Sequence, residues 1–68
     1  MPYVATDADG REYIYEDKPQ RGVRHDKVSI WINRIGDYIE LPQGSILRLI
    51  GRPLTHSDEP VKLKKVKP

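Results

Sequence analysis

LPQGSILRLIGRP, residues 41–53, is the stretch that decides the fold, because it predicts one short helix with both ends marked. Pro42 or Ser45 fits the first turn of a helix, and Gly51 fits the left-handed residue that closes one. Pro53 cannot continue a helix, because its ring blocks the required backbone geometry and it has no N–H to donate. The sequence therefore predicts a single short helix between these signals.

The apolar residues of this helix indicate where it packs. Ile46, Leu49 and Ile50 follow one another at the spacing of one helix face. An isolated helix this short is unstable in water, so packing must stabilise it. We therefore expect these three side chains to cover the open face of a sheet, and Leu47, which lies off that face, to meet Leu54.

A hairpin is predicted near the N-terminus. Residues 3–6 and 11–16 are rich in the Tyr, Val, Ile and Thr that favour strands. DADG lies between them, and Gly10 can supply the positive φ of a hairpin turn. Residues 17–26 follow with Pro19, a glycine and three basic side chains but no periodicity, so we expect a loop there.

Two further runs, residues 27–32 and 37–41, alternate apolar and polar residues at the period of a strand. Their aliphatic residues share one face, and Trp31 and Tyr38 lie on the opposite faces. NRIG, residues 33–36, can turn the chain between the two runs. We therefore predict a second hairpin, with an aliphatic inner face and with Trp31 and Tyr38 exposed on its outer face.

The part of the chain after the helix predicts a turn and a last strand. THSD, residues 55–58, is typical of a turn in which Thr55 and Asp58 hydrogen-bond each other's backbone. VKL, residues 61–63, alternates once more as a short strand. We expect one domain over residues 1–63 and a basic C-terminal tail over residues 64–68 that frays.

The expected element order is β-β-loop-β-β-α-β, which makes the fold mostly β. This order resembles that of small SH3-like barrels, in which the strands roll up and a helical turn precedes the last one. The resemblance is architectural, because the acidic and aromatic loop signature of peptide-binding SH3 domains is not present. The helix is longer than a single turn, so an open α+β antiparallel sheet packed by the helix is the alternative.

Length and composition bound the class of protein. The chain has 68 residues, which is enough for one domain with a small core. It contains no Cys, which excludes disulfides and fits a reducing compartment. No run is apolar over the roughly 20 residues that a membrane helix needs, and the N-terminus lacks the features of a signal peptide. We therefore expect a soluble, cytoplasmic protein with no membrane partner.

The residues that usually carry chemistry form no pattern of a catalytic or metal site. His25 and His56 lie in polar segments, without the ligand number and spacing that zinc needs. THSD has the residue types of a hydrolytic triad, but neighbouring side chains diverge, whereas a nucleophile and its base must converge. We therefore expect no enzyme, no metal and no cofactor.

Binding is the remaining class of function, and a protein is the first expected partner. Trp, Tyr and Arg contribute most of the energy at interface centres. We therefore predict a protein-binding cluster of Trp31, Tyr38 and Arg34, with Trp31 as its hot spot. An edge strand could also pair with a second copy and give a homodimer.

A further resemblance agrees with this expectation. The tract IELP at 39–42, GSI at 44–46, LIGR at 49–52, LT at 54–55 and DEP at 58–60 is similar to one in short uncharacterised proteins of bacteria and their phages. The resemblance implies a small accessory protein that binds and modulates a larger partner.

Nucleic acid is the alternative partner. Basic residues in the expected loop and in the tail could contact phosphates, and Trp31 and the tyrosines could stack on bases. The net charge argues against it, because four Lys in the last eight residues leave residues 1–60 at −2 out of the total of +2. Phosphates are then repelled unless the charges are segregated in space. The candidate contacts are Arg21, Arg24, Lys27, Arg52, Lys62, Lys64 and Lys65.

Overall fold

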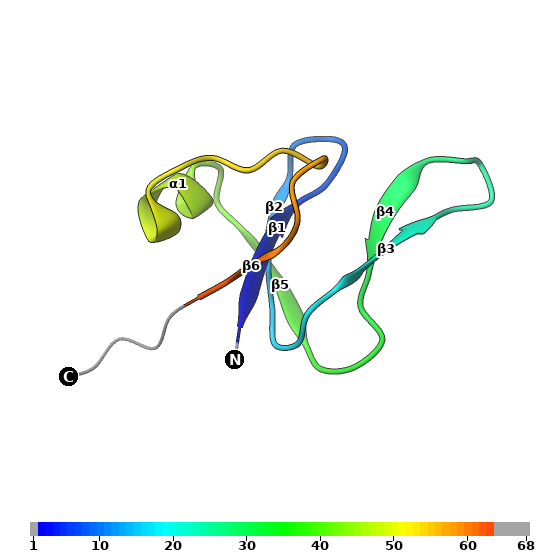
Figure 1. Cartoon of the computed structure of the whole chain (residues 1–68), viewed down its shortest axis with the longest axis horizontal. Coiled ribbons are helices and arrows are strands. Elements are labelled where there is room, and N and C mark those ends of the chain that lie inside the picture. Colours follow the sequence, from blue (N-terminus) through cyan, green and yellow to red (C-terminus); the bar gives the residue numbers. More distant parts are fainter. Residues whose placement is uncertain (1, 64–68) are drawn as a thin grey trace.

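The structure is a computed structural model that describes residues 2–63, and over this range the chain is mostly β (Figure 1). Six strands and one helix form within the described range. In chain order they are β1 (Tyr3–Thr6), β2 (Glu12–Tyr15), β3 (Gln20–Val23), β4 (Ser29–Ile32), β5 (Tyr38–Leu41), α1 (Ser45–Ile50) and β6 (Val61–Lys62).

The strands form two antiparallel sheets. One has four strands in the order β5-β2-β1-β6, and the other is the pair β3-β4. The described residues are mostly β, as predicted. Both sheets are open over these residues, and no closed barrel is present there. The open antiparallel sheet that we kept as the alternative agrees with this topology.

The first predicted hairpin is confirmed, and the second is wrong. β1 pairs with β2, with Val4 opposite Ile14. However, β4 pairs with β3 and not with β5, and β5 pairs with β2 at the edge of the other sheet. The segment that we expected to be a loop therefore contains a strand, β3.

The turn after β3 explains why β4 takes the nearer partner. Lys27 donates its backbone N–H to the carbonyl of Arg24, and Arg24 donates to the carbonyl of Val28. Lys27 adopts a left-handed conformation with φ of 67°. This tight turn brings β4 directly back along β3, which closes a short loop and so costs little chain entropy.

The aliphatic core lies between one face of the four-stranded sheet and α1. Val4, Ile46 and Leu54 are buried at its centre, and Ile50 packs against them. Leu49 is 52% exposed, so its predicted place in the core is wrong. The helix is only six residues long, and Ile46, Ile50 and the following Leu54 already fill the space over the sheet. Leu47 is half exposed and belongs to no buried cluster.

Both ends of α1 have specific partners. Gly51 has φ of 81° and donates its N–H to the carbonyl of Leu47, which confirms the predicted C-terminal signal. At the other end no side chain of the helix itself caps it. Instead, the carboxylate of Glu12 on β2 accepts bonds from the backbone N–H groups of Gly44 and Ile46, at 2.8 and 2.7 Å.

The segment after the helix follows the prediction. The backbone N–H and the hydroxyl of Thr55 both donate to the carboxylate of Asp58, at 2.8 and 3.2 Å. The hydrogen bond from the Thr55 N–H holds the pKa of Asp58 below its usual value. Val61 and Lys62 then pair with β1 as the short last strand.

The second face of the four-stranded sheet is aromatic. Tyr3, Tyr15 and Tyr38 stand opposite one another across β1, β2 and β5. Trp31 of β4 packs onto this face against Ala5 and Tyr15 and is only 7% exposed. The predicted exposure of Trp31 is therefore wrong. Strand alternation separated its face correctly but could not show that this face meets another sheet.

Among the described residues, no helix is long and apolar enough to cross a membrane.

Candidate functional site

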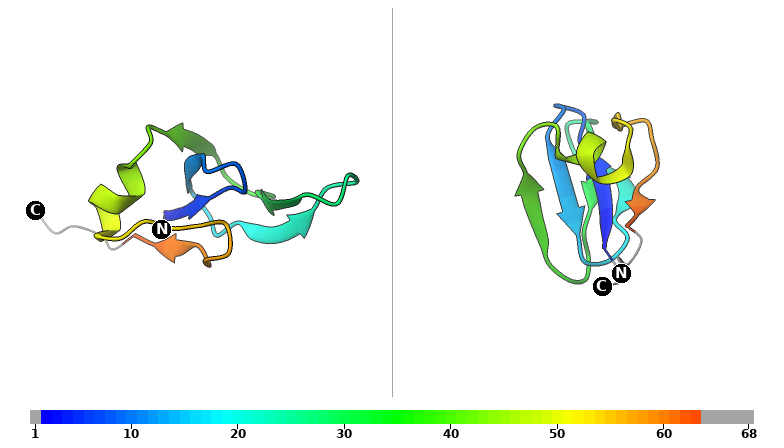
Figure 2. Two further views of the ribbon diagram at one scale, coloured as in Figure 1. Left: turned by 90° about the horizontal axis from the view of Figure 1, so that it is seen from above. Right: turned by 90° about the vertical axis from the view of Figure 1, so that its left-hand side faces the viewer.

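The strands β3 and β4 project from the rest of the molecule. Figure 1 and the left view of Figure 2 show this hairpin at one end of the long axis and α1 at the other. The molecule measures 44 × 24 × 18 Å along its principal axes. Within residues 2–63, no strand of the four-stranded sheet pairs with β3 or β4. We call residues 18–34 the β3–β4 ribbon.

We call the other described residues, 2–17 and 35–63, the body. Trp31 attaches one face of the ribbon to the body. Its indole Nε1–H donates to the carbonyl oxygen of Thr6 at 2.9 Å, and this bond is buried. The indole ring covers Ala5 and the ring of Tyr15. Burial holds the pKa of the Tyr15 hydroxyl well above its usual range. The attachment therefore combines apolar contact with one satisfied polar group.

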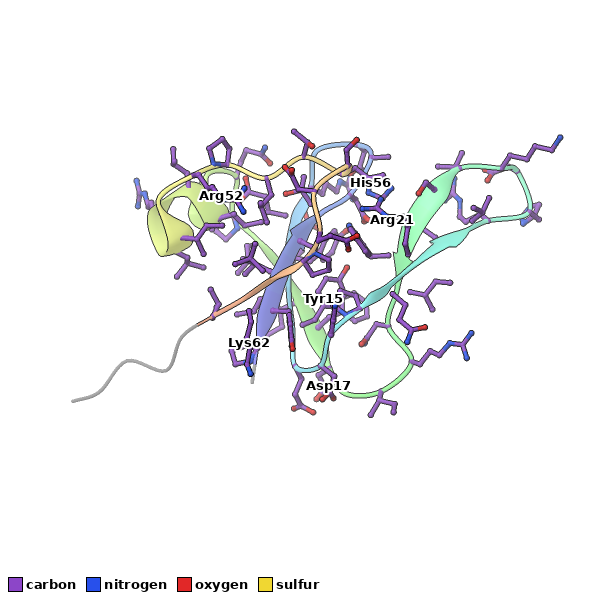
Figure 3. All side chains as sticks on the ribbon, in the orientation of Figure 1. Tyr15, Asp17, Arg21, Arg52, His56 and Lys62 are labelled. Carbon is purple, nitrogen blue, oxygen red and sulfur yellow. The ribbon has the colours of Figure 1, made fainter. Side chains whose placement is uncertain are left out.

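Arg21 and His56 complete this attachment, and Figure 3 shows their side chains side by side. The guanidinium of Arg21 lies 4.3 Å from the centroid of the Trp31 ring, a cation–π contact. The same group donates to the carbonyl oxygens of His56 and Asp58, at 2.7 and 3.3 Å. Arg21, predicted as a phosphate contact, thus also joins the ribbon to the body.

The ring of His56 is fully engaged. Its Nδ1 lies 3.2 Å from the carbonyl oxygen of Thr6, and its Nε2 lies 2.8 Å from the hydroxyl oxygen of Ser29 on β4. A carbonyl only accepts, so Nδ1 of the neutral ring carries the proton and Nε2 accepts from Ser29. The imidazole thus connects β1 to the ribbon, while His25 lies exposed at the ribbon tip.

A hollow of about 430 Å³ lies beside this attachment, between the β1–β2 turn and the start of α1. Glu12, Leu47 and His56 are among the residues that line it. The carboxylate of Glu12 already accepts two backbone N–H groups, and both ring nitrogens of His56 have partners. In the described residues, no group of three or more His, Cys, Asp or Glu is placed to hold a metal ion.

A second hollow of about 330 Å³ separates the β1–β2 turn from the ribbon. Asp7 and Asp9 line one side, and Arg24, Val28 and Ile30 are among the residues on the other. Partial burial, followed by repulsion from Asp9, raises the pKa of the Asp7 carboxyl. One edge of the ribbon therefore borders two carboxylates.

The outer face of the ribbon is partly exposed and borders the β1–β2 turn at Ile30 and Asp17 at Gln20 and Ile32. Gln20 and Gly22 of β3 lie opposite Ile32 and Ile30 of β4 on this face. A Cβ on Gly22 would overlap the side chain of Ile32, so the isoleucine lies directly across the glycine backbone. Both isoleucines are partly exposed, and Val28 beyond them is exposed.

Basic residues concentrate on this ribbon. Residues 18–34 hold five Lys or Arg and one Asp, a net charge of +4. The other described residues, 2–17 and 35–63, hold four Lys or Arg and nine Asp or Glu, a net charge of −5. The segregation in space that the sequence analysis required is thus present in the described range. The five basic residues of the ribbon are Lys18, Arg21, Arg24, Lys27 and Arg34.

The remaining predicted phosphate contacts are not part of this group. Figure 3 shows Arg52 beside α1 and Lys62 on β6, both away from the ribbon. Lys64 and Lys65 lie outside the described residues. The sequence thus identified part of the basic surface, and Lys18, one of the three basic residues of the expected loop, was not among the predicted contacts.

Arg24 is paired within the ribbon. Its Nη2 and Nε lie 2.9 and 3.3 Å from the two carboxylate oxygens of Asp26. This donation from Arg24 holds the pKa of Asp26 below its usual value. Lys18, Lys27 and Arg34 are exposed and form no salt bridge with any described residue.

The predicted protein-binding cluster is divided between different places. Tyr38 is 57% exposed at the free edge of the four-stranded sheet, where its ring stacks on Tyr15 with centroids 5.7 Å apart. Arg34 is exposed in the connection from β4 to β5, and Trp31 is buried. Ile39, next to Tyr38, is 66% exposed. Of the three predicted residues, Tyr38 and Arg34 remain accessible to a partner.

Comparison of this chain with models of protein families, with curated proteins and with solved structures finds no match.

Proposed function

We propose that this protein binds nucleic acid through the β3–β4 ribbon. The observation that carries the proposal is the charge distribution, with +4 on residues 18–34 of a projecting hairpin and a net −2 on the rest of the sequence. Such a distribution orients the molecule in the field of a polyanion, because phosphates attract the ribbon and repel the body. The body then serves as the support that holds the ribbon in place.

The exposed cations of the ribbon are the phosphate contacts in this proposal. Lys18, Lys27 and Arg34 have no carboxylate partner among the described residues, so binding breaks no salt bridge of theirs. Arg24 contributes after exchanging Asp26 for a phosphate or a base, and this exposed pair is weak. Arg21 keeps its structural place on the inner face of the ribbon.

A matched pair of triple variants tests the proposal. Lys18→Gln/Lys27→Gln/Arg34→Gln removes three charges from the ribbon, and Arg48→Gln/Arg52→Gln/Lys62→Gln removes three exposed charges from the body. The affinity of each protein for DNA and RNA probes is measured by fluorescence anisotropy over a salt series. We expect the ribbon variant to bind more weakly, with a slope of log K against log salt that is less steep by about 0.9 for each phosphate no longer neutralised.

The body variant is expected to keep nearly the slope of the unmodified protein. Circular dichroism establishes that both variants fold. Equal reductions in affinity and slope for the two variants would contradict the assignment to the ribbon, and no binding of the unmodified protein to any probe at low salt would contradict nucleic-acid binding altogether.

A protein partner is the second candidate, favoured by the exposure of β5. Tyr38 and Ile39 are both exposed on this edge strand. Ile39 lies in register with Ile14 on β2, and Asp37 accepts the N–H of Glu16, so the backbone groups of Tyr38 and Glu40 point away from β2. Within residues 2–63 no other strand pairs with β5, so these groups can pair with a strand from a partner.

The charge of the β5 edge indicates which kind of partner strand can pair with it. Asp37 and Glu40 lie on β5 or directly before it, and Glu16 lies on the neighbouring turn. Two copies joined edge to edge would bring these carboxylates together, which disfavours the predicted homodimer. A basic strand of another protein is the better complement.

Affinity capture from the host cell tests this candidate. The unmodified protein, Tyr38→Ser and Val23→Ser are used as baits, because Val23 is equally apolar at the surface but lies on the ribbon. A partner of β5 is retained by the Val23 variant, and its affinity for the Tyr38 variant falls by about tenfold or more if Tyr38 is a hot spot. If no captured protein depends on Tyr38, this candidate is wrong.

A further inference from the structure

We propose that the nucleic acid is a B-form DNA duplex and that the outer face of the β3–β4 ribbon enters its major groove. This inference rests on the proposed function, and it names the substrate of the same surface. Three features of the ribbon carry it: its width, the chemistry of its free face, and the burial of its only tryptophan.

The width of the ribbon matches one groove of one form of nucleic acid. Two paired strands lie only about 4.8 Å apart, so the ribbon is narrow. The major groove of B-DNA is about 12 Å wide and admits a two-stranded ribbon. The major groove of an A-form RNA duplex is too narrow for side chains to read, so duplex RNA does not accept the same element.

The inner face is attached to the body, although Val23 at its end is 66% exposed, so we assign the outer face to the groove. Trp31 and Ser29 lie on the inner face and are held to the body by Thr6 and His56. Gln20, Ile30 and Ile32 lie on the outer face, and the side chain of Ile32 lies across Gly22, which has none. Arg24 continues the alternation of β3 beyond its last residue.

The residue types of this face fit base edges. Glutamine recognises adenine, arginine recognises guanine, and aliphatic side chains contact the methyl group of thymine. Lys18 precedes β3 and Arg34 follows β4, while Lys27 lies in the turn at the far end. Cations thus flank both ends of the face, where the phosphates of the groove walls pass. The carboxylates of Asp7 and Asp9 border one edge and direct the phosphate contacts to the other parts of the ribbon.

The ribbon lacks what single strands require. Proteins that hold single-stranded nucleic acid stack its bases on exposed aromatic rings beside a basic groove. Trp31, the one Trp, Tyr or Phe of the ribbon, is buried beneath Arg21. Tyr38 is exposed, but it lies on β5 next to Glu40 and Asp37. Stacking surface and positive charge are therefore in different places among the described residues.

The first experiment compares probes of one sequence with the intact protein. Fluorescence anisotropy at about 50 mM salt measures binding to a DNA duplex of about 20 base pairs, two helical turns, to the matching RNA duplex and to each single DNA strand. We expect the DNA duplex to bind at least about tenfold more tightly than the others. Polyglutamate, added as a competitor at equal charge, should not displace it.

A second experiment tests the groove and the face. Netropsin, which occupies the minor groove, should leave binding nearly unchanged, and methyl green, which occupies the major groove, should abolish it. Gln20→Glu places a carboxylate on the outer face, and Gln43→Glu makes the same change on the exposed surface before α1. We expect the affinity of the Gln20 variant to fall by about tenfold or more, and that of the Gln43 variant to stay within about twofold.

The outcomes separate this inference from the proposed function. Equal binding of DNA duplex, RNA duplex and single strands overturns the inference but agrees with a ribbon that binds phosphates. Displacement by netropsin, or equal effects of Gln20→Glu and Gln43→Glu, also overturns it. Preferential binding of polyglutamate shows that the partner is an acidic protein, and no binding to any probe overturns both proposals.

Discussion

At the scale of single residues, Glu12 fixes the start of α1 to the four-stranded sheet. It lies on β2, is 8% exposed, and its carboxylate accepts the backbone N–H groups of Gly44 and Ile46. The start of a helix leaves such groups without partners, and α1 has neither an acidic residue in its first turn nor a capping side chain. One carboxylate from the sheet therefore both satisfies these groups and fixes the helix to the sheet.

We predict that Glu12→Ala lowers the free energy of unfolding by about 2 kcal/mol or more, because two N–H groups are deprived of a charged acceptor. Glu12→Gln should cost less, since its amide oxygen still accepts from one of them. Urea unfolding at neutral pH measures both. Glu59→Ala, at an exposed site, is the control. A decrease of less than about 0.5 kcal/mol for Glu12→Ala, the size of an ordinary surface effect, contradicts this assignment.

Neither Glu12 nor Trp31 could be placed from the sequence. Alternation in residues 27–32 separated Trp31 from its aliphatic neighbours, and that separation is correct. It did not tell which face is covered, because a strand has the same period whichever side meets another layer. The partners of Glu12 lie more than thirty positions away, and no local pattern encodes such a contact. Local signals were sufficient for Gly51 and for the Thr55–Asp58 turn, whose partners lie within four residues.

At the scale of elements, strand pairing depends on the turns as much as on the strands. β3 is Gln-Arg-Gly-Val, which has weak strand preference. Pairing with β4 makes it a strand all the same, because β4 follows after a tight turn. The segment between β4 and β5 then carries the chain to the far edge of the four-stranded sheet. Sequence patterns find strongly alternating strands, and they miss a weak strand that is stabilised by its neighbour.

Gly36 is the critical position of this segment. Its φ is 81°, and a Cβ there would approach the carboxylate oxygens of Asp17 and Glu16 to 2.6 and 2.8 Å. We predict that Gly36→Ala destabilises the fold by about 1 to 3 kcal/mol, from backbone strain together with this overlap. Thermal unfolding followed by circular dichroism measures the destabilisation.

Gly10→Ala is the matched control for this variant. Gly10 has nearly the same φ, 89°, but a Cβ there meets no atom within 4 Å. It should therefore show the backbone cost alone and unfold at a higher temperature than Gly36→Ala. Equal unfolding temperatures would mean that the two carboxylates move aside without cost.

At the scale of the whole molecule, two open sheets are joined by side chains. Trp31, Arg21 and His56 connect the ribbon to the body, and within residues 2–63 no strand pairing crosses between them. The charges divide along the same boundary. The net charge of each segment could be counted from the sequence, but the boundary itself could not, because it depends on β4 taking β3 as its partner. In the salt series proposed above, the slope of affinity against salt is the property that would report this division.

The attachment through Trp31, Arg21 and His56 also has a consequence for variation of the protein. Trp31 and Arg21, which hold the ribbon, lie on its inner face, whereas Gln20, Ile30 and Ile32 lie on its outer face. The residues of the outer face can therefore vary one by one while the residues that attach the ribbon to the body stay the same. If the ribbon binds nucleic acid as proposed, its specificity can change while its attachment to the body is kept.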